Sequence, residues 1–287
     1  MKIQITADST IDLSPELYQR FDIKVIPFVV TLGDNSYYDG IDIKTQDIFD
    51  YVSKAKELPK TGARSIDDMR DFFKQFTDQG ISVIHVGIGS KLSGGYGYAV
   101  SASKDNPLVH VIDTCTLSSG SGLIAMYASD LAKTGKYSAE QIVEMINKRT
   151  PYTQSSFIVE KLNYLYKGGR CSMISLLGAN LLRIKPCLQL VDGEIKVGKK
   201  YIGSTPNCVR KYFLDELNTF SNPDHTRVMV TYSTATQEML DVAKQVLQEY
   251  GKFKEVFFTS AGSVISCHCG ENTIGILYLN DGDHFVE

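Results

Sequence analysis

Short apolar runs alternate with amphipathic segments along the first half of the chain. Ile3 to Ala7 and Val109 to Ile112 have strand-like patterns, and Ile81 to Ile88 is almost wholly apolar, as in a central parallel strand. Thr45 to Leu58 and Ser118 to Ala132 show helical periodicity. This alternation predicts a mostly parallel sheet with helices on both faces.

Local signals refine this half of the chain. Ile23 to Val30 is a further apolar run, and Pro27 within it indicates an edge strand or a bulge. Ser65, followed three residues later by Asp68, forms a capping-box pattern that predicts a helix running to about Gln79.

The second half has a different pattern. Asp192-Gly193 lies between two strand-like runs, Cys187 to Val191 and Glu194 to Lys199, and predicts a β-hairpin. The other expected elements are a helix through Leu176 to Leu182, a helix from Thr205, a strand from Val228 to Tyr232, a helix from Thr234, and strands around Val256 and from Ile274 to Leu279. We predict an α/β fold of two domains: a mostly parallel three-layer sheet domain over residues 1–153, and a mixed-sheet α/β domain over residues 154–287.

Polar loops follow three of the expected parallel strands. They are Asp8-Ser9-Thr10, Ser90 to Gly95, and Asp113-Thr114. Ligands of parallel α/β sheets bind beyond the carboxyl ends of the strands, so we expect these loops to lie together at one edge and to form a binding site.

Ser93-Gly94-Gly95 is the most informative of these loops. It opens a predicted helix, where free backbone N–H groups and the helix dipole favour an anion. Ser93 adds a hydroxyl donor, and the glycines allow a ligand to approach the backbone. A serine that only caps the helix explains the pattern equally well.

Composition excludes several classes of function. The chain has 287 residues, 43% hydrophobic and 22% charged, with a formal net charge of −3, which argues against nucleic-acid binding. It has no apolar run long enough to span a membrane, and its N-terminus lacks the pattern of a signal peptide. We therefore expect a cytoplasmic protein with reduced thiols.

The motifs of cofactor and metal chemistry are incomplete. Gly87 and Gly89 begin a dinucleotide fingerprint, but Leu92 occupies the position of its third glycine. Cys267-His268-Cys269 invites a metal hypothesis, but neighbouring side chains of an extended segment point to opposite faces. We expect neither a metal nor a cofactor, and His268 remains either an anion donor or a buried structural imidazole.

Lys167-Gly168-Gly169-Arg170 is a basic glycine turn after a helix. It is typical of a helix C-cap whose basic residues complement the dipole. The same pattern suits an arginine aimed at a carboxylate or phosphate. Spacing does not choose between the two.

Taken together, these segments resemble the DegV family of bacterial fatty-acid-binding proteins. The matching segments, in family order, are Ala7 to Leu13, Tyr38-Asp39-Gly40, Leu92-Ser93-Gly94, Leu162 to Arg170, Lys185-Pro186 and Cys267 to Gly270. The resemblance implies two domains with the ligand between them. It implies that Thr61, Ser93 and His268 hold a fatty-acid carboxylate with help from the backbone near Gly94, and that a separate fatty acid kinase phosphorylates the bound acyl group in related proteins.

The chain departs from the family pattern in three places. Thr61-Gly62-Ala63-Arg64-Ser65 stands where the family usually has Thr-Ser-Gln-Pro-Ser, and Gly95 replaces a threonine. Tyr201 stands where kinase-coupled members have an arginine, although Arg170 is retained. The loss of one of two arginines that would face a phosphate argues against a kinase partner more than against lipid binding.

The resulting hypothesis is a carrier of a long-chain fatty acid with no catalytic residues of its own. Burial of about 15 tail carbons offers about 12 kcal/mol, so the tail would set the affinity and the head group the orientation. Candidates for the tail site are Ile174, Leu176, Leu177, Leu181 and Leu182. Two alternatives stay open: a phosphoryl- or acyl-transfer enzyme that uses Arg170 as a charge clamp, and a binder of a smaller carboxylate.

Overall fold

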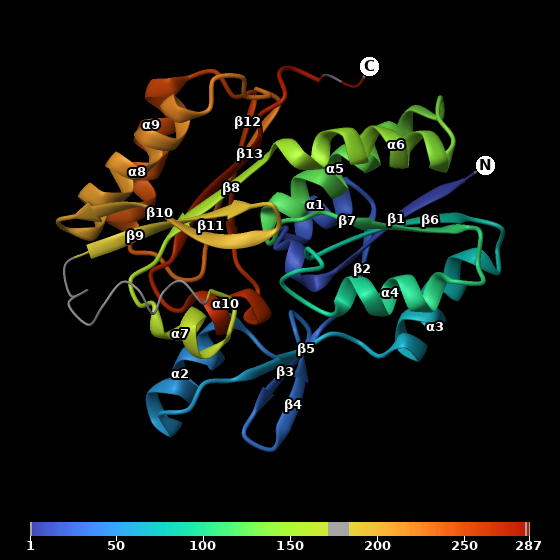
Figure 1. Cartoon of the computed structure of the whole chain (residues 1–287), viewed down its shortest axis with the longest axis horizontal. Coiled ribbons are helices and arrows are strands. Elements are labelled where there is room, and N and C mark those ends of the chain that lie inside the picture. Colours follow the sequence, from blue (N-terminus) through green and yellow to red (C-terminus); the bar gives the residue numbers. More distant parts are fainter. Residues whose placement is uncertain (1, 172–183, 285, 287) are drawn as a thin grey trace.

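The computed structural model describes residues 2–171, 184–284 and 286, and its strands form three sheets (Figure 1). The first sheet is parallel, with strand order β2-β1-β6-β7. Its strands are β1 (Ile3–Asp8), β2 (Ile23–Ile26), β6 (Ser82–Gly87) and β7 (Val109–Asp113). The expected parallel sheet is confirmed, and β2 lies at its edge and ends immediately before Pro27.

Helices cover both faces of the parallel sheet, as predicted (Figure 1). On one side lie α3 (Ile66–Thr77) and α4 (Gly95–Ser103). On the other side lie α1 (Pro15–Arg20), α5 (Ser119–Thr134) and α6 (Ala139–Arg149), and the short 3₁₀ turn η1 (Ser9–Ile11) follows β1. Ser65 forms the predicted capping box of α3, and Ser138 forms another at the start of α6.

The second sheet is mixed and has six strands in the order β10-β9-β8-β13-β11-β12. They are β8 (Thr153–Ile158), β9 (Ile184–Val191), β10 (Glu194–Ile202), β11 (Arg227–Tyr232), β12 (Glu255–Ser260) and β13 (Ile274–Leu279). The turn η2 (Thr150–Tyr152) leads into it, and α8 (Thr205–Thr219) and α9 (Gln237–Tyr250) pack beside it. Side chains of α5 pack against β1 of the first sheet and against Met229 and Leu277 of the second. One hydrophobic core therefore connects the two large sheets.

A small third sheet, β4-β3-β5, differs from the prediction. The apolar run from Ile23 to Val30 gives the predicted edge strand only as far as Ile26, because Pro27 has no N–H to continue a ladder. Its continuation becomes β3 (Val29–Leu32), paired with β4 (Asn35–Tyr38) and β5 (Lys60–Gly62). This sheet lies near α2 (Thr45–Ala55), α7 (Asn163–Lys167) and α10 (Ser263–Cys269) in Figure 1.

Helix α10 also corrects the sequence analysis. The segment Cys267 to Cys269 was expected to be extended, but it forms the last turn of this helix. Two helix ends differ slightly from the prediction. Helix α2 stops at Ala55 because Lys56 is left-handed, and α9 starts at Gln237, with Thr236 as its cap, and not at Thr234. The helix expected from Leu176 to Leu182 lies outside the described residues.

Within residues 2–171, 184–284 and 286, no helix combines the length and the apolar character that crossing a bilayer requires.

Candidate functional site

The polar loops after the parallel strands meet at one edge, as expected. The Asp8 carboxylate accepts hydrogen bonds from the backbone N–H groups of Thr10 at 2.9 Å and Ile88 at 3.0 Å. The Asp113 carboxylate accepts from the backbone N–H of Ser90 at 3.0 Å. These bonds tie the ends of β1, β6 and β7 into one rim.

A cavity of about 240 Å³ opens beside this rim, between the parallel sheet, the small third sheet, α7 and α10. Much of its wall is aliphatic and comes from Ile88, Leu92, Leu117, Leu165, Val264 and Ile265. The wall also contains Thr61, Ser93, Gly94, His268 and Arg170, so the structure brings the five predicted site residues together.

Thr61 and His268 form the polar centre of the cavity. Thr61 lies on β5, and His268 lies on α10, 207 positions later in the chain. Thr61 Oγ1 and His268 Nε2 are 2.8 Å apart. The other ring nitrogen, Nδ1, is buried and has no hydrogen-bond partner among the described residues. It lies against Gly168, where an added Cβ would be only 2.5 Å from it.

The charge state of His268 follows from its surroundings. Burial, and then the positive charge of Arg170, lower the pKa of His268 to about 4, so the ring is neutral near pH 7. With its proton on Nε2, the ring donates to Thr61 Oγ1. The hydroxyl proton of Thr61 then remains available to a ligand in the cavity.

Ser93 lines the cavity and lies immediately before the N-cap of α4. Its Oγ accepts a hydrogen bond from the backbone N–H of Gly95 at 3.2 Å, a local bond to the first residue of α4 and not that of an N-cap serine. The hydroxyl proton is still free to donate, and Gly94 is the N-cap of α4. Position 95 has no room for the threonine that the family usually has there. A Cβ on Gly95 would lie 2.6 Å from the ring of Phe28.

Arg170 links the glycine turn after α7 to the serine loop. Its Nε donates to Leu92 O at 3.3 Å, and its Nη1 donates to Gly168 O at 2.6 Å. The residue is exposed and also borders a neighbouring depression of about 550 Å³ that contains Lys91 and Lys196. The guanidinium therefore stands at the mouth of the cavity.

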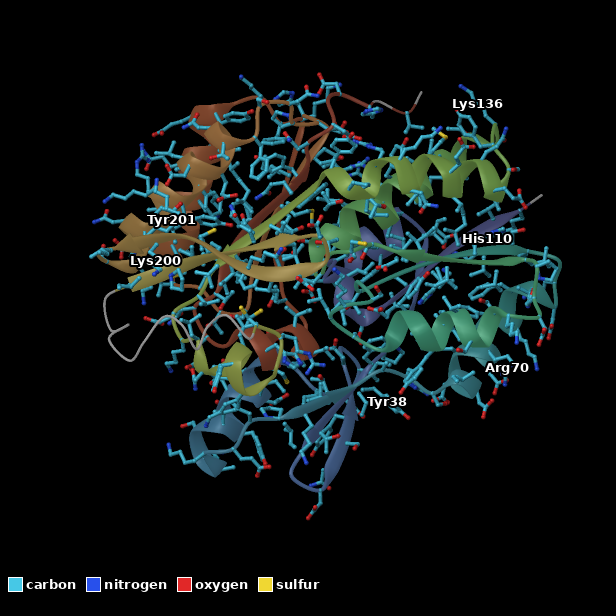
Figure 2. All side chains as sticks on the ribbon, viewed as in Figure 1. Tyr38, Arg70, His110, Lys136, Lys200 and Tyr201 are labelled. Carbon is cyan, nitrogen blue, oxygen red and sulfur yellow. The ribbon has the colours of Figure 1, made fainter. Side chains whose placement is uncertain are left out.

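Two departures from the family pattern lie elsewhere. Tyr201 lies on β10 (Figure 2). It is 3% exposed, donates to Asp215 Oδ2 at 2.8 Å and packs edge-on against Tyr212. Arg64 pairs with Asp68 at 3.1 Å and lies over the ring of Tyr38. Neither residue lines the cavity.

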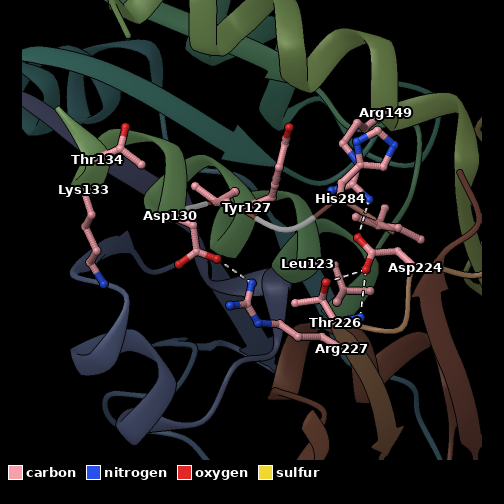
Figure 3. A pocket seen from close by; sticks show the side chains of 12 residues that line it. Leu123, Tyr127, Asp130, Lys133, Thr134, Arg149, Asp224, Thr226, Arg227 and His284 are labelled. Carbon is pink, nitrogen blue, oxygen red and sulfur yellow. Dashed lines mark hydrogen bonds and ion pairs between the residues drawn. The ribbon is translucent and has the colours of Figure 1, made fainter. Parts of the chain in front are cut away.

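A separate cavity of about 390 Å³ lies between α5 and the end of β13 (Figure 3). Its arginines are neutralised by the protein itself: Arg149 is 2.6 Å from Asp224, and Arg227 is 2.7 Å from Asp130. These ion pairs make it a poor anion site. In the part of the chain that the structure describes, no cluster of three His, Cys, Asp or Glu residues has the geometry to hold a metal ion.

The sequence analysis did not identify several residues of the cavity wall. They are Phe28, Leu117, Ile195, Val264 and Ile265, which come from four separate places in the chain. Each is an ordinary apolar residue in its local pattern. Val264 and Ile265 could have been found only from a helix prediction for α10. Such a helix places both residues within one or two turns of His268.

The neutral state of His268 predicts a pH dependence. A histidine whose folded pKa lies below its unfolded value of about 6.5 stabilises the fold fully above pH 6.5, and this contribution is lost as the pH falls towards 4. The shift corresponds to about 3 kcal/mol. Urea unfolding should therefore show that wild type loses about 3 kcal/mol relative to His268→Gln between pH 7 and pH 4. Comparison with the variant cancels opposing groups such as Asp8, whose pKa burial raises to about 6. A difference that does not vary with pH would contradict the buried neutral ring.

Solved structures of known proteins share this fold. A solved DegV family protein from Thermus thermophilus, described by its fatty acid binding, superposes with a TM-score of 0.90 at 26% identity, over 98% of this chain and 100% of that chain. A stearic acid-binding protein from Eubacterium ventriosum superposes with a TM-score of 0.80 at 26% identity, over 96% of this chain and 98% of that chain.

Sequence relatives extend over the same length. A DegV domain-containing protein of Clostridium acetobutylicum is 29% identical over 282 residues, which are 97% of this chain and 98% of the relative. The family model described as "Uncharacterised protein, DegV family" matches residues 2–281. The two-domain α/β fold and the match over nearly the whole length show that this chain belongs to the DegV family.

Proposed function

We propose that this protein binds a long-chain fatty acid, with the carboxylate at Thr61, Ser93 and His268 and the backbone near Gly94. The observation that carries the proposal is the Thr61–His268 pair, 2.8 Å apart, in a cavity whose wall is otherwise largely aliphatic. The relatives that bind fatty acids share the fold over nearly the full length.

The polar residues suit a carboxylate that has left water. A desolvated anion needs hydrogen-bond donors, and the Thr61 and Ser93 hydroxyls and the first turn of α4 supply them. Arg170 adds positive charge at the mouth. Hydrogen bonds to a charged group contribute about 1.5–3 kcal/mol each, which is less than the burial of a long tail.

The tail has an apolar path away from these donors. Leu117, Ile265 and Cys269 line both the main cavity and a small apolar space of about 30 Å³ beside β8 and β13. We propose that the acyl chain runs towards this space, between domains that comprise residues 1–153 and 154–287. The predicted tail contacts from Ile174 to Leu182 lie outside the described residues and stay a prediction.

The site suits a carrier better than an enzyme of acyl or phosphoryl transfer. A hydroxyl beside an imidazole is the start of a nucleophile–base pair, but a catalytic base is oriented by a third group on its other nitrogen. Among the described residues, Nδ1 of His268 has no such partner and faces Gly168. We propose a cytoplasmic carrier that needs no cofactor, in keeping with the absence of any disulfide among the described residues.

A fatty acid kinase remains the proposed partner. Arg170 and Lys196 border the mouth, where a phosphate on the carboxylate would emerge. Tyr201, which stands where kinase-coupled members have an arginine, is buried and bonds to Asp215, so Arg170 would be the arginine that faces the phosphate.

Substitution of the two hydroxyls tests the proposal. Thr61→Val and Ser93→Ala should each weaken palmitate binding by about 10- to 100-fold, because each removes a hydrogen bond to a charged group. Titration calorimetry on delipidated protein measures this. Thr31→Val on the adjacent strand and Ser101→Ala on helix α4 are matched controls, since their hydroxyls bond to Ser36 and Gly97 O instead.

Mass spectrometry of the purified protein provides the direct test. A bound acyl chain of about 16 to 18 carbons should co-purify and be released on denaturation. A protein that is free of lipid and takes up neither palmitate nor oleate would refute the proposal. Binding of short carboxylates alone would favour the alternative of a small-carboxylate binder.

A further inference from the structure

Two family-matching segments, Ala7 to Leu13 and Tyr38 to Gly40, contain aspartates that are absent from the cavity wall. Asp12 is 3% exposed and Asp39 is 4% exposed. In the part of the chain that the structure describes, neither carboxylate forms an ion pair with a basic residue. Buried carboxylates without a cation need other donors, so their partners identify what they do.

The partners lie at the start of helix α10. Asp12 Oδ1 accepts from the backbone N–H of Gly262 at 2.8 Å, and Asp39 Oδ1 accepts from the backbone N–H of Ser263 at 2.7 Å. These are the N-cap and first residue of the helix, and Gly262 has no side chain with which to cap it. Two aspartates, more than 220 residues away in the chain, thus accept hydrogen bonds from the free N–H groups at the start of the helix, in place of a capping side chain.

The carboxylates are themselves held in place. Asp12 Oδ2 accepts from Ser118 Oγ at 2.5 Å, and Asp39 Oδ2 accepts from Ser9 Oγ at 2.8 Å. A Cβ at Gly262 would lie 3.1 Å from both oxygens of Asp39 and 3.2 Å from Asp12 Oδ1. The helix start therefore fits closely between two fixed acceptors.

Helix α10 transmits this position to the binding site. It carries Val264, Ile265 and His268, all in the cavity wall. Its far end is also tied down, because the Thr273 hydroxyl donates to Cys269 O at 2.9 Å. A helix of seven residues rises about 10 Å and behaves as a short rod, so displacement of its first turn moves His268 relative to Thr61.

We infer that Asp12 and Asp39 are positioning residues of the fatty-acid site, acting through helix α10 on His268. This inference rests on the proposed function for its effect on affinity. Its structural part, the effect on His268, does not depend on any ligand.

Asp39 variants separate a positioning role from general stability. Asp39→Ala removes the acceptor for Ser263, and palmitate affinity per folded molecule should fall about tenfold or more. Asp39→Asn keeps a carbonyl acceptor and should restore affinity to within about threefold of wild type. Asp224→Ala, which disturbs another buried aspartate far from α10, is the matched control: it should lower stability without changing affinity.

The NMR signals of the His268 ring provide the readout without ligand. In lipid-free protein they should shift in Asp39→Ala and return towards wild type in Asp39→Asn. In a His268→Ala background, Asp39→Ala should cause little further loss of affinity. If Asp39→Ala does not fold, Gly262→Ala replaces it, because its methyl group crowds the same two carboxylates at an unstrained φ of −64°.

The outcomes distinguish the two proposals. A wild-type protein that binds no acyl chain refutes the proposed function, while the ring signals of lipid-free protein still decide the positioning role. A folded Asp39→Ala or Gly262→Ala variant with unshifted His268 signals and wild-type affinity overturns the inference.

Discussion

Replacement of Arg149 by methionine should lower the free energy of unfolding by about 3–5 kcal/mol. The Arg149 side chain is 4% exposed at the end of α6. Its Nη2 lies 2.6 Å from Asp224 Oδ2, its Nε lies 2.7 Å from Asp281 Oδ2, and its guanidinium covers the ring of Tyr127 (Figure 3). The substitution keeps much of the apolar volume but leaves two buried carboxylates without a cation.

Urea unfolding at pH 7 measures this loss. The control is Arg210→Met, because Arg210 pairs with Glu249 at 2.9 Å on the surface, where such pairs contribute about 0–1 kcal/mol. Palmitate affinity per folded molecule should be unchanged in both variants, since neither arginine borders the proposed site. A loss below 1 kcal/mol for Arg149→Met would mean that the two aspartates find other donors or take up protons.

Strands were predictable where both faces are buried. The apolar run from Ile274 to Leu279 coincides with β13, and the run from Ile81 to Ile88 contains β6. Strands β4 and β5 were missed for a physical reason. Residues Asn35–Tyr38 are largely exposed, and Lys60–Gly62 is only three residues long, so neither has a clear period of two. Their strand character comes from pairing with β3.

Helix α10 shows how tertiary contacts override local preference. The segment Ser263–Cys269 is short and rich in β-branched residues and cysteine, and its N-cap is a glycine. No local signal begins a helix there. Carboxylates of Asp12 and Asp39, from the other end of the chain, provide the missing cap.

The binding residues were predictable only as a set. Thr61 and His268 are 207 positions apart, and their 2.8 Å contact cannot be read from either local pattern. The order of family motifs supplied that association. The direction in which Tyr201 points was not predictable, because the ladder between β9 and β10 shifts register between Val197 and Lys200. A bulge reverses which face the following residues occupy, so the orientation of Tyr201 did not follow from its spacing to the hairpin.

Gly168→Ala should weaken palmitate binding by about 100-fold, or about 2.7 kcal/mol. The added methyl group would lie 2.5 Å from His268 Nδ1 and 2.9 Å from Tyr164 O, which is closer than non-bonded atoms approach. Gly168 has a φ of −72°, so alanine introduces no backbone strain and the effect is steric. The ring must move away from the methyl group, and it then loses the 2.8 Å contact with Thr61 that orients the hydroxyl for the ligand.

Calorimetric titration of lipid-free protein measures the loss, and Gly97→Ala on helix α4 is the matched control, because a Cβ there meets nothing within 4 Å. The two substitutions should separate clearly, with Gly97→Ala binding as wild type. In a His268→Ala background the methyl group no longer has a ring to displace, so Gly168→Ala should cost less than about threefold in affinity. An equal loss in both backgrounds would show that Gly168 acts through the α7 turn and not through His268. Arg170 also donates to Gly168 O. That result would therefore mean that the turn containing Arg170, and not the His268 ring, orients the head group.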